Sequence, residues 1–276
     1  MNLKNLLNNT WDIGKVITKY ATICSIVMLS STKLESYLLE LCNFKNDSDI
    51  AKQFKQDTRL AFERLNTEAQ YLNVTDSAYV RLDRILNKAK EDIIIKIMAD
   101  QPILPPDNVD IINRQIENIL SEEGFVYEPT ATLEKGLDEK HLDCDTKTTI
   151  YRSIYTSLFP NIQFNSVAAP RHIFMRFSDP YLKTHTNIEC TRGQRLSDEY
   201  YIKNNKLDKY IMEKERYLCT LSDDEVKSVW YHGISSETAG NLPKTSARTA
   251  MLATKLTPAQ RFQKNINFVK FLNYIY

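Results

Sequence analysis

The feature that most constrains the fold of this chain is a change in the spacing of its apolar residues. In Asp47–Leu72 and again in Ser77–Met98, apolar residues recur mostly every three or four positions, the pattern of one helix face. From Ile162 to Phe177, β-branched and aromatic residues dominate instead, as in β-strands. Helical signals return at Ser197, a serine cap followed by two acidic residues. The pattern predicts an α+β protein with a small sheet between helical regions.

Prolines and helix caps divide the sequence into three predicted regions. Three of the five residues Pro102–Pro106 are prolines, which stop a helix because proline lacks an N–H donor. We therefore expect a helical N-terminal region over residues 1–105, a core over 106–205 and a helical C-terminal region over 206–276. Capping boxes at Ser222–Glu225 and Thr257–Gln260 bracket a helix, a stop at Gly240 and a second helix, so the last region weakly resembles one tetratricopeptide repeat.

The charge balance and the cysteines exclude some classes of protein. The net charge is +1, so no basic field is expected to hold a nucleic acid. The five cysteines are odd in number and far apart, which favours a reducing, cytoplasmic location. No run approaches the roughly 18 apolar residues of a membrane-spanning helix. The most apolar stretch, Tyr20–Leu29, is interpreted as part of a buried helix, and the alternative is the core of a signal peptide for export.

A cysteine at the predicted start of a helix is the first candidate for chemistry. Within Leu142–Phe159, apolar residues repeat every four positions from Ile150, so the helix should begin near Asp143 or Cys144. Free N–H groups at that end favour a thiolate, which lowers the thiol pKa, and they can hold an oxyanion. Asp143 and Asp145 oppose the thiolate unless they cap the helix or point away. Cys144 is therefore a candidate nucleophile, and the alternative is a cysteine without a function.

A histidine and a glutamate on two predicted strands are the candidates to complete such a site. A thiol nucleophile needs an imidazole to exchange protons with it and with the leaving group. His172 opens the first strand, on the face that also carries Phe174 and Arg176. Asn187 and Glu189 share one face of the next strand. If the strands pair in antiparallel fashion, Glu189 can orient His172, provided that the register is right.

Three motifs together resemble the transglutaminase-like cysteine protease superfamily. They are LDCDTKTTIYRSI, APRHIFMRF and NIECTRGQRLSDEYYI. They look closest to bacterial members whose pattern runs Leu-Asp-Cys-Asp-Thr, Pro-x-His-x-Phe-x-Arg and Asn-x-Glu-Thr-Thr-x-Gly, followed by a Ser/Thr-Asp-Glu-x-Tyr helix start. The likeness covers roughly Asn108 to Asn204. It implies a papain/transglutaminase-like core, in which the helix that carries the cysteine packs on a small antiparallel sheet.

The resemblance also implies roles for individual residues. The nucleophile, the acid–base and the orienting residue would be Cys144, His172 and Glu189. Many members have aspartate or asparagine in the third role, so Glu189 is a variant and Asn187 is a substitute. Cys190 stands where the related pattern has threonine, and we expect it on the core face. A second oxyanion donor often lies upstream of the cysteine; Tyr127 is the candidate, and the alternative is a packing tyrosine.

The predicted reaction is acyl transfer on an amide bond through a thioester, without a cofactor or a metal ion. Hydrolysis of a protein or peptide, by a peptidase or a deamidase, is the expected outcome, because no second cleft for an amine acceptor can be recognised in the sequence. Cross-linking to a lysine stays open. By analogy, the helical flanks suggest that a protein substrate or partner is recognised.

Two other interpretations stay open. The first is a zinc site, because His141 and Cys144 are three residues apart and further ligands could come from His172, His185 and Cys190. Against it, structural zinc sites usually use tighter paired spacings such as C-x2-C. The second is a catalytically inactive domain of the same fold that binds a protein.

Overall fold

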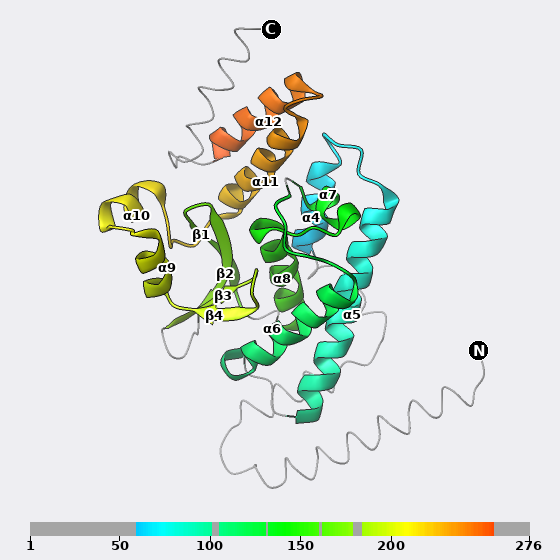
Figure 1. Cartoon of the computed structure of the whole chain (residues 1–276), viewed down its shortest axis with the longest axis vertical. Helices are drawn as coiled ribbons and strands as arrows, with labels where there is room; N and C mark the ends of the chain where they lie inside the picture. Colours follow the sequence, from blue (N-terminus) through cyan, green and yellow to red (C-terminus); the bar gives the residue numbers. More distant parts are fainter. Residues whose placement is uncertain (1–58, 101–104, 131, 160–161, 179–183, 257–276) are drawn as a thin grey trace, which may run out of the picture. The chain divides into compact units, whose positions relative to one another are not determined.

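Nine helices and a four-stranded antiparallel sheet make up the described part of the chain, in agreement with the predicted α+β class (Figure 1). The computed structural model describes residues 59–100, 105–130, 132–159, 162–178 and 184–256. The elements, in chain order, are α4 (Arg59–Glu68), α5 (Asp76–Asp100), α6 (Pro105–Glu122), α7 (Leu133–Glu139), α8 (Cys144–Leu158), β1 (Phe164–Ala169), β2 (His172–Ser178), β3 (His185–Glu189), β4 (Gln194–Leu196), α9 (Asp198–Asn205), α10 (Lys209–Glu215), α11 (Asp223–Thr238) and α12 (Pro243–Leu256).

The chain divides into two compact units, Met1–Gln53 and Phe54–Tyr276, and every described residue belongs to the second. The boundaries expected at residues 105 and 205 both fall inside that unit and stay predictions. The apolar stretch Tyr20–Leu29 and the capping box Thr257–Gln260 lie outside the described residues. Within the described ranges, no helix is long and apolar enough to cross a membrane.

The sheet has the strand order β1-β2-β3-β4, and each strand runs antiparallel to its neighbours. The predicted pair of β2 and β3 is present, with Met175 opposite Ile188. The sequence analysis did not separate β1 from β2, which a turn at Pro170–Arg171 connects, and it missed β4. Because the strands are antiparallel, this turn and the turn at residues 190–193 lie at the same end of the sheet. We call this the site end.

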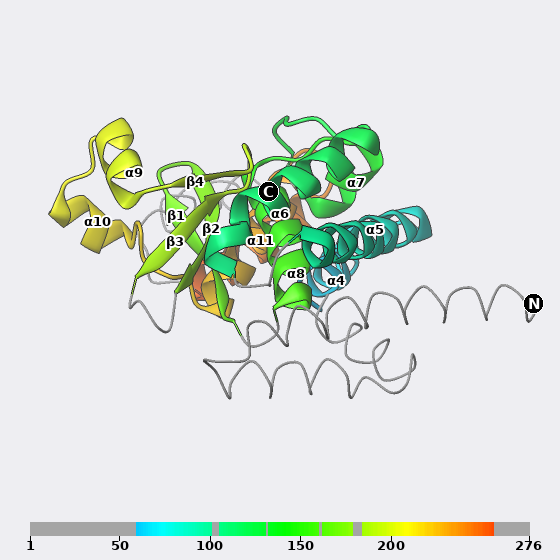
Figure 2. The same ribbon diagram turned by 90° about the horizontal axis from the view of Figure 1, so that it is seen from below.

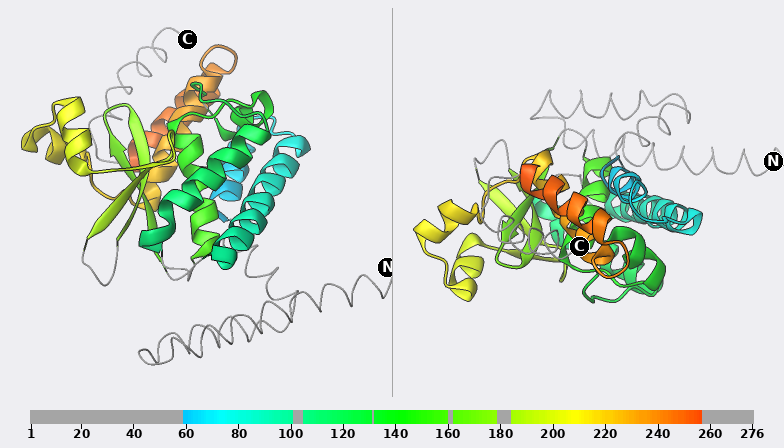
Figure 3. Two further views of the ribbon diagram at one scale, coloured as in Figure 1. Left: turned by 60° about the horizontal axis from the view of Figure 1, so that its bottom comes forward. Right: turned by 90° about the horizontal axis from the view of Figure 1, so that it is seen from above.

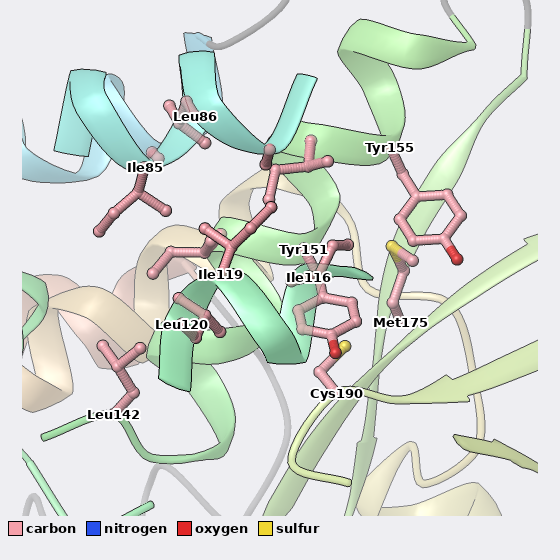
Figure 4. Packing of buried hydrophobic residues seen from close by; sticks show 14 of the residues in the cluster. Ile85, Leu86, Ile116, Ile119, Leu120, Leu142, Tyr151, Tyr155, Met175 and Cys190 are labelled. Carbon is pink, nitrogen blue, oxygen red and sulfur yellow. The ribbon is translucent and has the colours of Figure 1, made fainter. Parts of the chain in front are cut away.

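The two faces of the sheet pack against different helices. On one face, Met175 and Ile188 belong to the main core cluster together with Tyr151 of α8. Figure 4 shows Met175 and Tyr151 of this cluster. On the other face, Phe174 packs with Tyr201 of α9. Figure 2 shows α8 and α9 on opposite sides of the sheet. The predicted alternation of side chains along β2 is confirmed, because successive residues enter different clusters.

Helix α8 lies between the sheet and the helices that precede it in the sequence. It contacts β1 and β2, and it also contacts α4 and α5. Leu65 of α4 and Ile85 of α5 are in the same buried cluster as Ile150 and Ile154 of α8. The left view of Figure 3 shows α5 and α6 beside α8 on one side of the sheet. The N-terminal helices therefore help to hold the helix that carries Cys144.

Helices α11 and α12 pack against each other, and α11 also contacts α4. The predicted capping box at Ser222–Glu225 is confirmed at the start of α11. Trp230 of α11 is buried in a cluster with Ala168 of β1. A helical pair is thus present, as Figure 1 shows. The predicted third helix begins at Thr257, outside the described residues, so the tetratricopeptide likeness stays a prediction.

Candidate active site

Helix α8 begins at Cys144, as predicted, because the residue before the cysteine caps its first turn. The Asp143 side chain accepts a hydrogen bond from the N–H of Thr146 at 3.1 Å, and Thr146 Oγ1 accepts one from the N–H of Asp143 at 2.9 Å. This capping box engages one of the two carboxyl groups that flank the cysteine. The N–H of Cys144 belongs to the first turn, whose donors have no acceptor within the helix.

His172 and Glu189 form the hydrogen bond that the strand pattern predicts. The distance between His172 Nε2 and Glu189 Oε2 is 2.6 Å. The contact runs diagonally across the strands, since the β2–β3 register continued by one residue places Phe174 opposite Glu189. Both side chains are largely buried, at 21% and 5% exposure for His172 and Glu189. The register of the sheet therefore brings the acid to the histidine at the site end.

Glu189 accepts hydrogen bonds from four donors. Besides His172, the hydroxyl of Tyr201 donates to Oε2 at 2.9 Å. The N–H and the hydroxyl of Thr191 donate to Oε1 at 3.0 and 2.6 Å. Burial opposes the ionised form, but the hydrogen bond and charge of His172 and the two bonds from Thr191 outweigh it and lower the pKa of Glu189 to about 2. Glu189 is thus an ionised acceptor with both oxygens occupied.

The contacts of the His172 ring determine which of its nitrogens is available for chemistry. The rings of Phe174 and Tyr201 lie 6.3 and 6.2 Å from the imidazole, centroid to centroid, and stack on each other at 4.2 Å. An ionised Glu189 at Nε2 requires a proton on that nitrogen. Nδ1 is therefore the nitrogen that can accept a proton in neutral His172.

The Cys144 sulfur lies at the start of β2, beside the residue that follows His172. A hydrogen bond with the backbone of Ile173 favours the thiolate of Cys144. One turn later on α8, the hydroxyl of Thr148 donates to the carbonyl of Ile173 at 3.2 Å. Two residues of α8 therefore attach this helix to β2 next to the histidine. The sequence motifs did not predict this contact between α8 and Ile173.

The lowered thiol pKa expected from the helix end is wrong for this structure. Burial raises the pKa of Cys144 to about 12, and the charges of Asp145, Asp143 and Glu189 add to the increase. The cysteine is partly exposed, but most of its surroundings are protein, and desolvation cannot be read from a sequence motif. At neutral pH the resting group is a thiol. A partner has to accept its proton before or during any attack.

Asp145, the second flanking carboxyl group, faces an arginine from α4. Arg64 Nη2 lies 3.1 Å from Asp145 Oδ2, and Arg64 Nε donates to Glu68 at 3.0 Å. Glu68 also accepts the N–H groups of Leu133 and Glu134, each at 2.8 Å, at the start of α7. Burial raises the pKa of Asp145 well above its usual range, although Arg64 acts in the opposite direction. The sequence analysis assigned Arg64 no role, because a buried cation has no local signal.

Tyr127 lies near the cysteine, in a segment that pairs with the chain just before α8. The N–H of Val126 donates to the carbonyl of Lys140, and the N–H of Leu142 donates to the carbonyl of Val126, both at 2.9 Å. Partial burial and the nearby charge of Cys144 raise the pKa of Tyr127. The residue is 56% exposed. Tyr127 is therefore not a core packing residue.

Asn187 lies on the same face of β3 as Glu189, but its amide is engaged with other residues. Its Oδ1 accepts from Arg176 Nε at 2.6 Å, and its Nδ2 donates to Asp198 at 2.8 Å. Arg176 also forms an ion pair with Asp198 and donates to the carbonyl of Leu218. Glu189, and not Asn187, bonds His172. Asn187 connects the sheet to the start of α9.

The residues considered for zinc have separate partners. His141 Nδ1 lies 3.4 Å from Glu128, and His185 Nε2 lies 3.1 Å from Asp198. Cys190 is fully buried on the core face, as expected. Among the residues that the structure describes, no group of three or more His, Cys, Asp or Glu could hold a metal ion.

Two contacts of the acid were found only in the structure. Thr191 and Tyr201 both bond Glu189, and neither received a role in the sequence analysis. Tyr201 carried a signal, since it ends the Ser-Asp-Glu-x-Tyr run at the start of α9.

Comparisons with protein-family models, curated proteins and solved structures gave no match for this chain.

Proposed function

We propose that this protein is a cysteine-dependent amide hydrolase with Cys144 as nucleophile, His172 as acid–base and Glu189 as orienting residue. The observation that carries the proposal is the 2.6 Å bond from His172 Nε2 to an ionised Glu189, which leaves Nδ1 free to act as a base. The backbone of the next residue, Ile173, bonds the Cys144 sulfur. A thiol, an imidazole and a carboxylate in this order have the roles of a catalytic triad.

In the first step, the Cys144 sulfur attacks the carbonyl carbon of the amide. The thiol proton moves to Nδ1 of His172 as the S–C bond forms, because a pKa of about 12 leaves almost no thiolate at neutral pH. Ionised Glu189 stabilises the imidazolium through Nε2. The N–H of Cys144 and the hydroxyl of Tyr127 are the donors that we assign to the oxyanion.

In the second step, the C–N bond of the amide breaks and the imidazolium of His172 gives its proton to the departing amine. The acyl group is then a thioester on Cys144. Water attacks the thioester while His172 takes a proton from it, and collapse releases a carboxylic acid and returns the proton to sulfur. A lysine amine in place of water would give a cross-link. We favour hydrolysis, by a peptidase or a deamidase, because water needs no binding groove of its own.

We further propose that residues 106–205 form a papain/transglutaminase-like core that acts on a protein or peptide. The support is the order of its parts: a cysteine at the start of α8, then a histidine on β2 and an acid on β3, with α8 packed against β2. Helices α4 and α5, which contact α8, are then additions to that core. With the C-terminal helices, they are the regions that we assign to recognition of a protein substrate or partner.

One observation favours a second candidate, an inactive core that binds a protein. The pKa of Cys144 is raised, whereas activated thiols usually have a lowered pKa. The two candidates differ in whether His172 can take the thiol proton. The reactivity of the thiol therefore separates them.

The experiment is the pH dependence of iodoacetamide alkylation, read for each cysteine by mass spectrometry, in wild type and His172→Ala. In wild type we expect Cys144 to be alkylated below pH 8, because His172 takes the thiol proton as the S–C bond forms, and the exposed Cys219 serves as the free-thiol reference in the same chain. In His172→Ala we expect Cys144 to react at least about tenfold more slowly than Cys219, because a buried thiol without a base has little thiolate.

His185→Ala is the matched control, since His185 lies on β3 and bonds Asp198 instead of Glu189. This variant should leave the alkylation of Cys144 unchanged. If His172→Ala leaves it unchanged as well, the hydrolase proposal fails, and the core is better described as a binding module.

A further inference from the structure

Two arginines occupy the turns at the site end of the sheet. Arg171 lies in the turn before β2 and directly precedes His172; Arg192 lies in the turn after β3 and follows Glu189 by three residues. Both are exposed. Since adjacent strands stand about 4.8 Å apart, the two turns lie roughly two strand spacings from each other. The backbone positions of two arginines therefore flank the residues proposed to be catalytic.

Neither arginine is neutralised by a carboxylate in the part of the chain that the structure describes. Nearby arginines on the same sheet differ in this respect: Arg176 pairs with Asp198, and Arg195 pairs with Asp110 at 2.6 Å. The acidic residues closest to Cys144 have other partners, namely Thr146 for Asp143, Arg64 for Asp145 and His172 for Glu189. The positive charge at the site end is left for a ligand.

The turn that carries Arg192 is held in place from several sides. The N–H of Arg192 donates to the carbonyl of Glu189 at 3.2 Å, and Lys147 of α8 donates to the carbonyl of Thr191 at 3.4 Å. Gly193 has φ +61°, and a Cβ at this position would lie 2.9 Å from Glu117 Cγ. Glycine is needed here both for its backbone angle and for the close contact. A rigid turn of this kind presents Arg192 in a defined position.

The side chain of Arg192 reaches toward α9. Its Nη1 lies 3.5 Å from the hydroxyl of Tyr200, which is 36% exposed. Burial raises the pKa of the Tyr127 hydroxyl, and the charge of Arg192 acts on the same group to lower it. The guanidinium is therefore within electrostatic range of a group that stands beside the nucleophile.

Arg171 occupies a backbone conformation that an arginine rarely adopts. Its φ is +56°, in the left-handed region that glycine or asparagine usually fills. Lys140, Lys206 and Arg216 have similar angles where they cap helices, so the angle by itself marks a turn. A glycine would complete the turn between β1 and β2 with less strain. The arginine side chain is the feature that such a replacement would lose.

We propose that Arg171 and Arg192 bind an acidic side chain of the substrate, an aspartate or glutamate close to the amide that Cys144 attacks. The proposal rests on the proposed hydrolase function and names its substrate class. Arginine suits this role because its planar guanidinium donates two parallel hydrogen bonds to a carboxylate. The aromatic side chains of Tyr127 and Tyr200 provide a surface for the neighbouring peptide.

The test compares anionic and neutral alkylating reagents on the full chain. We would measure the rate of Cys144 labelling by iodoacetate and by iodoacetamide in low salt, for wild type, Arg171→Gln, Arg192→Gln and Arg192→Glu. Each neutralising change should lower the iodoacetate/iodoacetamide ratio by about threefold, the effect of one charge roughly 7 Å away in water, and Arg192→Glu by about tenfold. High salt should remove the difference.

A second probe pair brings the comparison closer to a peptide. Acetyl-Asp-Gly and acetyl-Asn-Gly chloromethyl ketones differ by one charge, and the aspartyl reagent should label wild-type Cys144 faster. Arg192→Glu should invert this order. Arg195→Gln, which removes an equal charge from β4, is the control and should leave both ratios unchanged.

Two failures are distinguishable. If the charge ratios are the same in wild type and in the Arg171 and Arg192 variants, the acidic-substrate proposal is overturned, while the activated cysteine stands. If Cys144 alkylation does not depend on His172, the hydrolase proposal fails and this one fails with it.

Discussion

Two strands of the sheet carry a histidine paired with a carboxylate, and the two pairs differ in what else the carboxylate binds. His172 Nε2 lies 2.6 Å from Glu189 Oε2 at the site end. His185, the first residue of β3, lies 3.1 Å from Asp198 at the start of α9. Both pairs are on the face of the sheet that packs against α9. A histidine beside a carboxylate therefore does not by itself distinguish the proposed site from the second pair.

The difference lies in what else the carboxylate binds. Asp198 forms an ion pair with Arg176 and accepts from Asn187, so its charge is already balanced by a guanidinium. Glu189 has no arginine partner among the described residues; its other donors are the neutral groups of Thr191 and Tyr201. Its negative charge is left to stabilise a positive His172 ring. This is what a general base needs when it takes a proton.

The largest expected effect is a difference in the rate of amide hydrolysis between variants of the two histidines. His172→Ala should lower the rate of amide hydrolysis by a factor of about 10² to 10⁴, the usual contribution of a general acid–base. His185→Ala should keep the rate within about twofold, because His185 is 43% exposed and contacts neither Cys144 nor Glu189 in the structure. Turnover of a peptide library would measure both. Equal losses in the two variants would contradict the assignment.

The second prediction is that Glu189 contributes to the pH dependence of the free energy of unfolding. Its pKa falls from 4.5 in the unfolded chain to about 2 in the folded protein, which corresponds to stabilisation on the order of 3 kcal/mol. Because the folded pKa is lowered, this contribution is complete above pH 4.5 and is lost as the pH falls toward 2. Urea unfolding between pH 6 and 2.5 should show the loss in wild type and a flatter profile in Glu189→Gln.

The control for the pH experiment is Glu213→Gln, since the Glu213 side chain is 69% exposed. This variant should keep the wild-type slope. A Glu189→Gln profile as steep as that of wild type would show that other groups cause the acid sensitivity.

The smallest expected effect is a loss of stability when Glu189 loses one of its neutral hydrogen-bond donors. Tyr201→Phe removes the hydroxyl that bonds Glu189 at 2.9 Å but keeps the ring that stacks on Phe174. We expect the free energy of unfolding to fall by about 1 kcal/mol, the usual net value of one hydrogen bond. Alkylation of Cys144 should change by less than about threefold. Tyr210→Phe, at an exposed tyrosine, is the control; a similar loss there would remove the argument for the bond.

Local sequence patterns predicted the elements that carry the site. The start of α8 at Cys144 follows from Asp143 and Thr146, which are close in sequence and cap the helix without help from the rest of the chain. The alternation in β2 and β3 placed His172 and Glu189 on matching faces. Both predictions rest on backbone periods and capping, which nearby residues dictate. The catalytic roles themselves stay predictions.

The sequence by itself therefore determined the α+β order, the helix start at the cysteine and the faces of the two strands, because these depend on neighbouring residues. Only the tertiary structure decided the diagonal hydrogen bond of His172 with Glu189. It also decided the hydrogen bond from Arg176 to Asn187 and the ion pair of Arg64 on α4 with Asp145. It also decided the raised pKa of Cys144. Burial and charge pairing depend on residues far apart in the sequence, and no local pattern contains them.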